Sequence, residues 1–218
     1  MAIHLLRDLE NLKKEILLLG AMVEEATHKA ILTVVDRRAE LAEEVILGDR
    51  DVDDREVQLE EECLKVLALH QPVANDLRFV LAVIKVNNDL ERMGDLAKNI
   101  AERGRDLARE KPTVVPQEIR TMAERVRRML RDSLNAVVQS DMSLARSVLE
   151  HDEEVDELHK RIFSVVKDRI RERPEDVESL IQLLSVSRYL ERSADLATNI
   201  AEDVVFMVDG EVIRHQGH

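Results

Sequence analysis

The sequence is poor in the side chains that nucleic-acid binding usually requires. It contains no tryptophan, one tyrosine and three phenylalanines, so few aromatic rings are available to stack on bases. Lys and Arg number 32 against 45 Asp and Glu, and the formal net charge is −13, whereas nucleic-acid-binding faces are usually basic. We therefore expect no nucleic-acid partner, and we expect cations or basic protein surfaces instead.

Cysteine and long apolar runs are also scarce. Cys63 is the one cysteine in the chain, which excludes an intramolecular disulfide, and we expect it to be a small buried apolar side chain. No apolar run approaches the roughly 20 residues that span a bilayer. The first residues also lack the basic-then-apolar pattern of a signal peptide. These absences predict a cytoplasmic protein without direct membrane insertion.

The chain has only four prolines and six glycines, and charged residues make up 35% of it. Apolar residues recur at steps of three and four, which predicts long amphipathic helices and an all-α fold. In the first half we expect helices over 3–35, 39–47 (ending at Gly48), 49–70 and 72–109 (beginning at Pro72). In the second half we expect helices over 117–138, 142–171 (with a kink near His151) and from Pro174 onward.

Two of the four prolines lie in the segment 111–116, and proline interrupts a helix interior. We expect this segment to link two halves that are copies of one another. The predicted division is a first repeat over 1–110, a second over 117–210 and a tail over 211–218.

The strongest sign of duplication is a thirteen-residue motif. LERMGDLAKNIAE at 90–102 returns as LERSADLATNIAE at 190–202, with ten of thirteen positions identical. On a helix, Glu91, Asp95 and Asn99 fall on one face and their counterparts Glu191, Asp195 and Asn199 do the same. The apolar residues of the motif fall on the opposite face. We therefore expect an inward apolar side and an outward acidic side in each copy.

A second acidic pair precedes each motif, Asp49 with Asp53 and Asp152 with Asp156. Residues equidistant from the turn of an antiparallel helical hairpin lie at the same height, because each helical residue rises about 1.5 Å. Asp53 and Glu91 are both nineteen residues from Pro72. The spacing therefore predicts four carboxylates at one level in each half.

Such clusters suggest metal binding. Carboxylates without His or Cys are hard oxygen ligands, suited to divalent or trivalent ions such as Mg, Ca, Mn or Fe. The predicted ligands are Asp49, Asp53, Glu91, Asp95, Asp152, Asp156, Glu191 and Asp195, with Asn99 and Asn199 as additional candidates. The alternative is that the acids are solvated or form salt bridges, with Arg92 and Arg192 as the expected partners.

An enzymatic alternative is a ferritin-like carboxylate-bridged metalloenzyme, whose signature is a Glu-x-x-His motif on each of two helices. Glu25 with His28 is such a pair, but Arg131 stands at the position in the second half that aligns with His28. His215 and His218 in the tail are further candidate metal ligands. No Gly-rich phosphate loop or Ser-His-Asp set is present, so we expect no enzyme.

Basic residues cluster on the helix expected over 117–138. This cluster consists of Arg120, Arg125, Arg127, Arg128 and Arg131. It could dock an acidic partner or form a solvated helix face, and the sequence assigns it no role.

HQPVANDLR at 70–78, the two copies of the repeated motif and the paired acids upstream together resemble the PhoU-type phosphate-uptake regulators. The resemblance covers nearly the whole chain. It implies two pseudo-symmetric antiparallel three-helix bundles and metal ions at the acidic motifs. The chain departs from this family at Leu196, where relatives often carry a histidine directly after the aspartate, so the departure argues against an imidazole ligand at the second site.

The resemblance also implies a function without catalysis. Such a protein would act as a negative regulator of high-affinity phosphate uptake and phosphate-starvation signalling. Its implied partners are the ATP-binding subunit of the phosphate ABC transporter and a sensor histidine kinase, through which it would reach the membrane peripherally. An accessory subunit of another phosphate transporter is the further alternative. We also expect a homodimer, because long helices with several apolar faces leave surface to cover.

Overall fold

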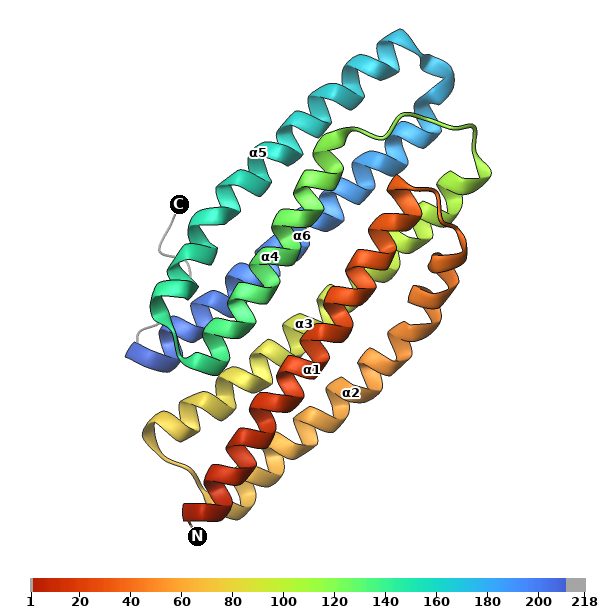
Figure 1. Ribbon diagram of the computed structural model, residues 1–218. Helices are drawn as coiled ribbons and strands as arrows, with labels where there is room; N and C mark the ends of the chain where they lie inside the picture. Colours follow the sequence, from red (N-terminus) through yellow and green to blue (C-terminus); the bar gives the residue numbers. More distant parts are fainter. Residues whose placement is uncertain (1, 211–218) are drawn as a thin grey trace.

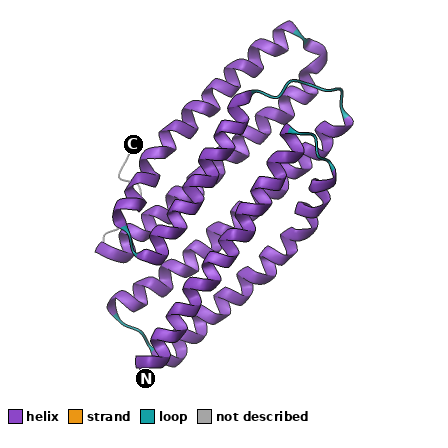
Figure 2. Ribbon diagram, in the orientation of Figure 1, coloured by secondary structure: helices purple, strands orange, loops and turns teal. Residues whose placement is uncertain are grey.

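The computed structural model describes residues 2–210, and within them the chain is built from helices and short connections (Figure 2). The six α-helices are α1 (Ala2–Val35), α2 (Glu40–His70), α3 (Ala74–Arg109), α4 (Gln117–Gln139), α5 (Met142–Glu172) and α6 (Val177–Asp209). A 3₁₀ turn, Pro174–Asp176, precedes α6. The all-α prediction is confirmed.

The helices form two units of three. Helices α1, α2 and α3 pack against one another, as do α4, α5 and α6, and the two units lie side by side along α3 and α6 (Figure 1). Helices α1 and α4 add a second contact between the units. This arrangement confirms the prediction of two pseudo-symmetric antiparallel three-helix bundles.

The prediction that a helix ends at Gly48 is wrong, because α2 runs unbroken from Glu40 to His70. Val45 before Gly48 and Val52 after it are both buried, so packing continues on both sides of the glycine. Glycine in a helix interior costs about 1 kcal/mol relative to alanine. The tertiary packing of α2 along its whole length offsets this cost. The chain turns earlier, where Arg37 has a φ of 55°.

The predicted helix starts at the prolines are displaced by a few residues. Pro72 lies in the connection between α2 and α3, after Gln71 has ended α2 in the left-handed conformation. Pro174 begins the 3₁₀ turn, and α6 follows from Val177. Helix α5 continues through His151, where a kink was expected. Both prolines still mark the boundary between helices.

Residues 111–116 lie outside the helices, between α3 and α4. This placement suits a connection, although the exact bounds of the two repeats stay a prediction. The predicted tail over 211–218, with His215 and His218, lies outside the described residues.

Close helix packing shapes the first unit at Gly104. A Cβ atom at Gly104 would lie 2.9 Å from the carbonyl carbon of Thr33, on α1. Since real side chains avoid such a distance, α1 and α3 can approach this closely only with glycine here.

Cys63 is fully buried, as predicted.

Polar contacts join the two units across α3 and α6. The ammonium of Lys85 lies 3.1 Å from an Asp203 carboxylate oxygen and 4.8 Å from the centre of the Phe206 ring. Arg103 donates a hydrogen bond of 3.1 Å to Gln182. The helices that carry the two acidic motifs are therefore held against each other.

Within residues 2–210, no helix combines the length and apolar character needed to cross a bilayer.

Candidate metal centres

The two copies of the repeated motif have the same pattern of burial at all thirteen positions. Leu90 and Ile100, like Leu190 and Ile200, are fully buried. Within each copy the first glutamate is half-buried and the aspartate four residues later is exposed. The predicted inward apolar side and outward acidic side are confirmed in both halves.

The first acidic cluster is formed by α2 and α3. Asp49 and Asp53 lie one turn apart on α2, and Glu91 and Asp95 lie one turn apart on α3. Asp49 is only 7% exposed. Its Oδ2 atom lies 2.5 Å from the Nζ atom of Lys98, a residue of α3.

Charge couples these carboxylates. Burial raises the pKa of Asp53, and the charges of Asp49 and Asp95 raise it further. Burial likewise raises the pKa of Glu91, followed by the charges of Asp95, Asp53 and two further carboxylates. The hydrogen bond to Asp49 raises the pKa of Lys98. The structure therefore brings all four predicted residues of the first half into one field of negative charge, with Lys98 as its counterion.

A fifth carboxylate, Glu56, borders this cluster and was missed in the sequence. Burial raises the pKa of Glu56, and the charges of Glu60 and Asp53 raise it further. The Asn87 amide donates hydrogen bonds to the backbone oxygen of Glu56, at 2.8 Å, and to its carboxylate, at 3.1 Å. The spacing of three residues from Asp53 could have indicated Glu56, because that spacing repeats on one helix face.

The second cluster is formed by α5 and α6. Burial raises the pKa of Asp195, and the charges of Glu191 and Asp156 raise it further, while Arg192 acts in the opposite direction. Asp152 is half-buried one turn before Asp156 on α5. The second half therefore repeats the meeting of acids from two facing helices.

An imidazole replaces the fifth carboxylate in the second half. The spacing between repeats puts His159 at the position of Glu56, and Ser187 at the position of Asn87. The Nδ1 atom of His159 lies 3.0 Å from Ser187 Oγ, whose hydroxyl donates to the Leu184 carbonyl oxygen. His159 and Glu191 line one cavity of about 410 Å³. An imidazole thus lies beside the second cluster, supplied by α5, while position 196 within the second motif is a leucine.

The salt-bridge partner expected for the first cluster was the wrong one. Arg92 lies 3.7 Å from Asp89 on its own helix, and Lys98 instead pairs with the cluster. Arg192 does act on the second cluster through Asp195.

The donor chemistry of both clusters fits hard metal ions, because each cluster has carboxylates on two facing helices that act on one another through their charge. Throughout residues 2–210, however, no three His, Cys, Asp or Glu side chains stand in an arrangement that could hold one ion. The residues that could hold metal are the eight predicted carboxylates, with Asn99 and Asn199 half-buried one turn further along. Metal ligation by these residues stays a prediction.

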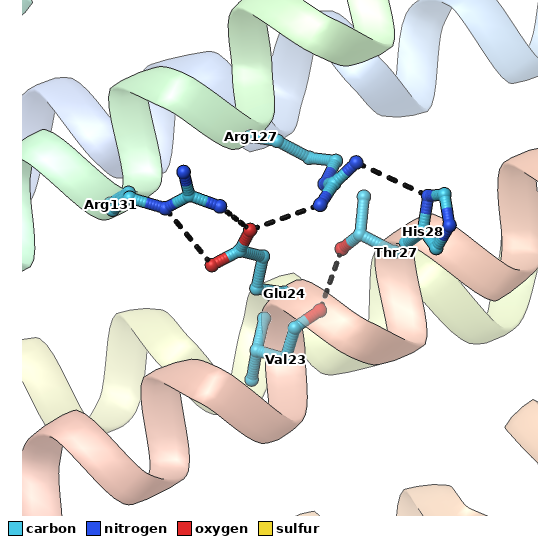
Figure 3. A network of polar contacts seen from close by, with 6 residues as sticks. All are labelled: Val23, Glu24, Thr27, His28, Arg127 and Arg131. Atoms are coloured by element: carbon cyan, nitrogen blue, oxygen red, sulfur yellow. Dashed lines mark hydrogen bonds and ion pairs between the residues drawn. The ribbon is translucent and has the colours of Figure 1, made fainter.

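The Glu25 and His28 pair has other contacts. Arg127 of α4 donates a hydrogen bond of 3.2 Å to His28 Nδ1 (Figure 3). Glu25 lies 3.6 Å from Lys29. His28 is therefore a histidine at the interface between the two halves.

The basic residues of α4 have a structural role that the sequence did not assign. Arg127 and Arg131 both contact the carboxylate of Glu24 on α1, the former at 3.1 Å (Figure 3). Arg120 lies 3.0 Å from Asp36, just beyond α1. Burial acts to raise the pKa of Glu24, but hydrogen bonds from Arg131 and Arg127 outweigh it and lower that pKa. These arginines join the two halves through charge.

Six long helices in two copies of one unit, with acids shared between two helices of each copy, define a duplicated helical-bundle protein. The PhoU domain model matches residues 16–104 and 119–204, one match in each half. The chain belongs to the PhoU family.

Curated relatives and solved structures agree with this assignment. The chain is 40% identical to the phosphate-specific transport system accessory protein PhoU homolog of Aquifex aeolicus, over 97% of this chain and 96% of that protein. It is similar to the crystal structure of PhoU from Pseudomonas aeruginosa, with a TM-score of 0.88, 32% identity and coverage of 94% and 99% of the two chains. It is also similar to the phosphate transport system regulatory protein PhoU from Streptococcus pneumoniae, with a TM-score of 0.86, 30% identity and coverage of 96% and 99%. The family is one of accessory and regulatory proteins, not of enzymes.

Proposed function

We propose that this phosphate transport system accessory protein is a negative regulator of high-affinity phosphate uptake and phosphate-starvation signalling. The observation that carries the proposal is the 40% identity over 97% of the chain with a protein described as a phosphate-specific transport system accessory protein. Similarity that spans both repeats supports a shared role for the whole protein, beyond a shared fold.

The protein acts as an adapter between two partners, the ATP-binding subunit of the phosphate ABC transporter and a sensor histidine kinase. Two pseudo-symmetric halves offer two similar surfaces, which supports a role in bringing partners together. The net charge of −13 favours basic partner surfaces and disfavours direct contact with anionic lipid. The adapter is cytoplasmic and is held at the membrane by these partners.

Each half binds metal ions through its acidic cluster. The carboxylates of Asp49, Asp53, Glu91 and Asp95 hold the ions of the first half, and the second half uses their counterparts. Mn, Fe, Mg and Ca all suit these oxygen ligands. Burial, and then the charges of neighbouring carboxylates, raise the pKa values of Asp53, Glu91 and Asp195, and a bound ion would supply positive charge that offsets the repulsion between these carboxylates.

Metal content tests this part of the proposal. Protein purified without chelators or affinity metals should lose part of its metal with Asp95→Ala or Asp195→Ala, and most of it with both changes. Asp51→Ala is the matched control, because exposed Asp51 lies between Asp49 and Asp53 on α2. Elemental analysis that finds equal metal in the double variant and the wild type would rule out these clusters as the sites.

The protein is also proposed to form a homodimer. Large apolar side chains are exposed on α2 and α5, including Leu47, Leu64, Leu69 and Phe163, and such surface often marks an interface. Sedimentation at micromolar concentration should therefore give a species heavier than the 25.0 kDa chain. A single species of that mass would exclude the dimer.

Deletion of the gene tests the regulatory function. Starvation genes should stay active in high phosphate, and wild-type protein should restore their repression. Pull-downs with the purified protein should recover both proposed partners. Normal repression in the deletion strain would refute the negative-regulator function, and oxygen consumption by the protein with added ferrous iron would favour the metalloenzyme. Recovery of a different phosphate transporter would favour the accessory-subunit alternative.

A further inference from the structure

The second half has an apolar and partly exposed groove between α5 and α6. Its lining includes Phe163 of α5 together with Ile181 and Leu184 of α6, around a cavity of about 410 Å³. Phe163 is 53% exposed and Ile181 is 47% exposed. Contiguous apolar side chains that are exposed to this extent often mark an interaction site.

Cations surround the α5–α6 groove. Arg188 lines it, and the exposed Lys160 and Lys167 lie three residues before and four residues after Phe163 on α5, which puts them on the same side of that helix. One carboxylate, that of Glu191, also lines the groove. In a chain with a net charge of −13, this local excess of positive charge favours an occupant that is both apolar and acidic.

The outer surface of α2 has this complementary character. Val57 and Leu64 are 51% and 54% exposed, and their separation of seven residues puts them on one side of the helix. The exposed Glu60 and Glu61 lie between them in the sequence. An amphipathic helix with apolar side chains at positions i and i+7 is the form that fits an apolar groove. We refer to these four residues as the α2 face.

Neither surface is repeated in the other half of the chain. By the spacing between repeats, Glu60 stands at the position of Phe163. On α5, Lys160 and Lys167 stand at the positions of the two apolar residues of the α2 face. The duplicated fold therefore carries two unlike surfaces, one in each half, and the charges and apolar side chains of one complement those of the other.

We propose that the α2 face of one copy of this protein docks in the α5–α6 groove of a second copy. The inference rests on the proposed self-association and names the two surfaces that form the contact. The two apolar side chains of the α2 face pack against Phe163 and Ile181, and its two glutamates face Arg188 and the neighbouring lysines. Because the surfaces differ, the contact takes one surface from each copy, and it joins copies head to tail unless two copies make it reciprocally.

Variants that copy one half into the other remove one surface at a time. Phe163→Glu brings the glutamate of the first half into the α5–α6 groove. Val57→Lys combined with Leu64→Lys brings the lysines of the second half onto the α2 face. Sedimentation equilibrium of each purified protein at micromolar concentrations measures its association. Circular dichroism should show each variant to be as helical as the wild type.

The wild type should associate, and each variant alone should associate more weakly by about tenfold or more, the scale of one large apolar side chain left unburied. An equal mixture of the two variants should associate again, because one retains the α2 face and the other retains the α5–α6 groove. Added salt should weaken the association of the wild type. Association in the mixture but in neither variant alone would identify a contact between unlike surfaces.

Leu69→Lys is the matched control for exposed apolar surface. Leu69 is 73% exposed on the same helix, and its separation of five residues from Leu64 puts it on a different side of α2. The substitution makes the same chemical change as Leu64→Lys and should leave association unchanged. Equal weakening by Leu69→Lys and Leu64→Lys would assign association to general apolar exposure and overturn the inference.

Three other results would also overturn it. If the wild type and both variants associate equally, the proposed self-association stands and the two surfaces are wrong. If each variant loses association and the mixture does not recover it, each surface pairs with its own kind. If the wild type stays a single species of 25.0 kDa, the self-association and the inference fail together. Loss of a proposed partner from pull-downs with Phe163→Glu would then assign the groove to that partner.

Discussion

Replacement of Gly48 by alanine should stabilise this protein. Gly48 lies inside α2, and a Cβ atom built there meets no other atom within 4 Å. Among the described glycines, a positive φ occurs only at Gly210, so the backbone at Gly48 accepts an L side chain without strain. Alanine loses less backbone entropy than glycine on folding, which is worth roughly 0.5–1 kcal/mol in a helix interior.

The sign of the effect decides between two structures. If Gly48 ended a helix in the left-handed conformation, as its sequence context suggests, alanine there would cost about 1 kcal/mol or more. In the continuous α2 helix it should instead raise the free energy of unfolding. A gain of roughly 0.5–1 kcal/mol corresponds to about 1–4 °C in the melting temperature for a chain of this size.

Urea unfolding followed by circular dichroism would measure the change. Chelator should be present throughout, because Gly48 precedes Asp49 and bound metal would add its own stabilisation. An unchanged m-value with a higher midpoint would assign the gain to stability. A lower midpoint for Gly48→Ala would refute the continuous helix.

Gly104→Ala is the matched control with the opposite sign. Its Cβ would lie 2.9 Å from the Thr33 carbonyl carbon, so α1 and α3 would have to separate. Overpacking of this kind costs about 1–3 kcal/mol. If both glycine substitutions changed stability in the same direction, the packing argument would be wrong.

Three further predictions concern titration and reactivity. The pKa of Asp53 is raised in the fold, so the ionised carboxylate lowers the stability of the folded protein. This loss of stability is absent below the pKa of Asp53 in the unfolded chain and is complete above its pKa in the fold. Asp53→Asn should therefore stabilise chelator-treated protein by a few tenths of a kcal/mol at pH 8 and by nothing near pH 3, as melting curves would show. The pKa of Glu24 is lowered, so Glu24→Gln should cost about 1 kcal/mol at neutral pH, less in high salt, and the difference should vanish as pH falls through the folded pKa. Burial raises the pKa of Cys63 to about 12, so a thiol reagent should react with native protein only at the rate of unfolding, and rapid reaction would contradict its burial.

Much of the fold can be predicted from the sequence because apolar residues recur in it at a helical period. Apolar steps of three and four predict all of the long helices, with the single α2 helix predicted as two pieces divided at Gly48, and the repeated motif has the same burial in both halves. Local signals at single residues were less dependable. Gly48 is a helix-stop residue by its own preference, yet burial of Val45 and Val52 on either side keeps the helix intact. Pro72 marks a boundary correctly but lies before the helix that it was expected to begin.

The sequence likewise predicts some features of the candidate sites and not others. Counting residues from the turn put Asp53 and Glu91 at one level, and their raised pKa values agree with that proximity. The sequence does not reveal that Lys98 reaches Asp49, because the rotation of α2 about its axis depends on packing. The contacts from Arg127 to α1 depend in turn on how the halves dock.

The position of α2 and α5 at the outside of the molecule has a consequence for local opening. Each packs against the two other helices of its own half, whereas α3 and α6 also pack against each other (Figure 1). A helix with fewer neighbours opens at a lower free energy than the whole protein unfolds. Backbone amides of α2 and α5 should therefore exchange with deuterium sooner than those of α3 and α6. Each acidic cluster joins one outer helix to one central helix. An ion bound there would therefore hold α2 against α3, or α5 against α6, and so stabilise the helix of each half that opens first.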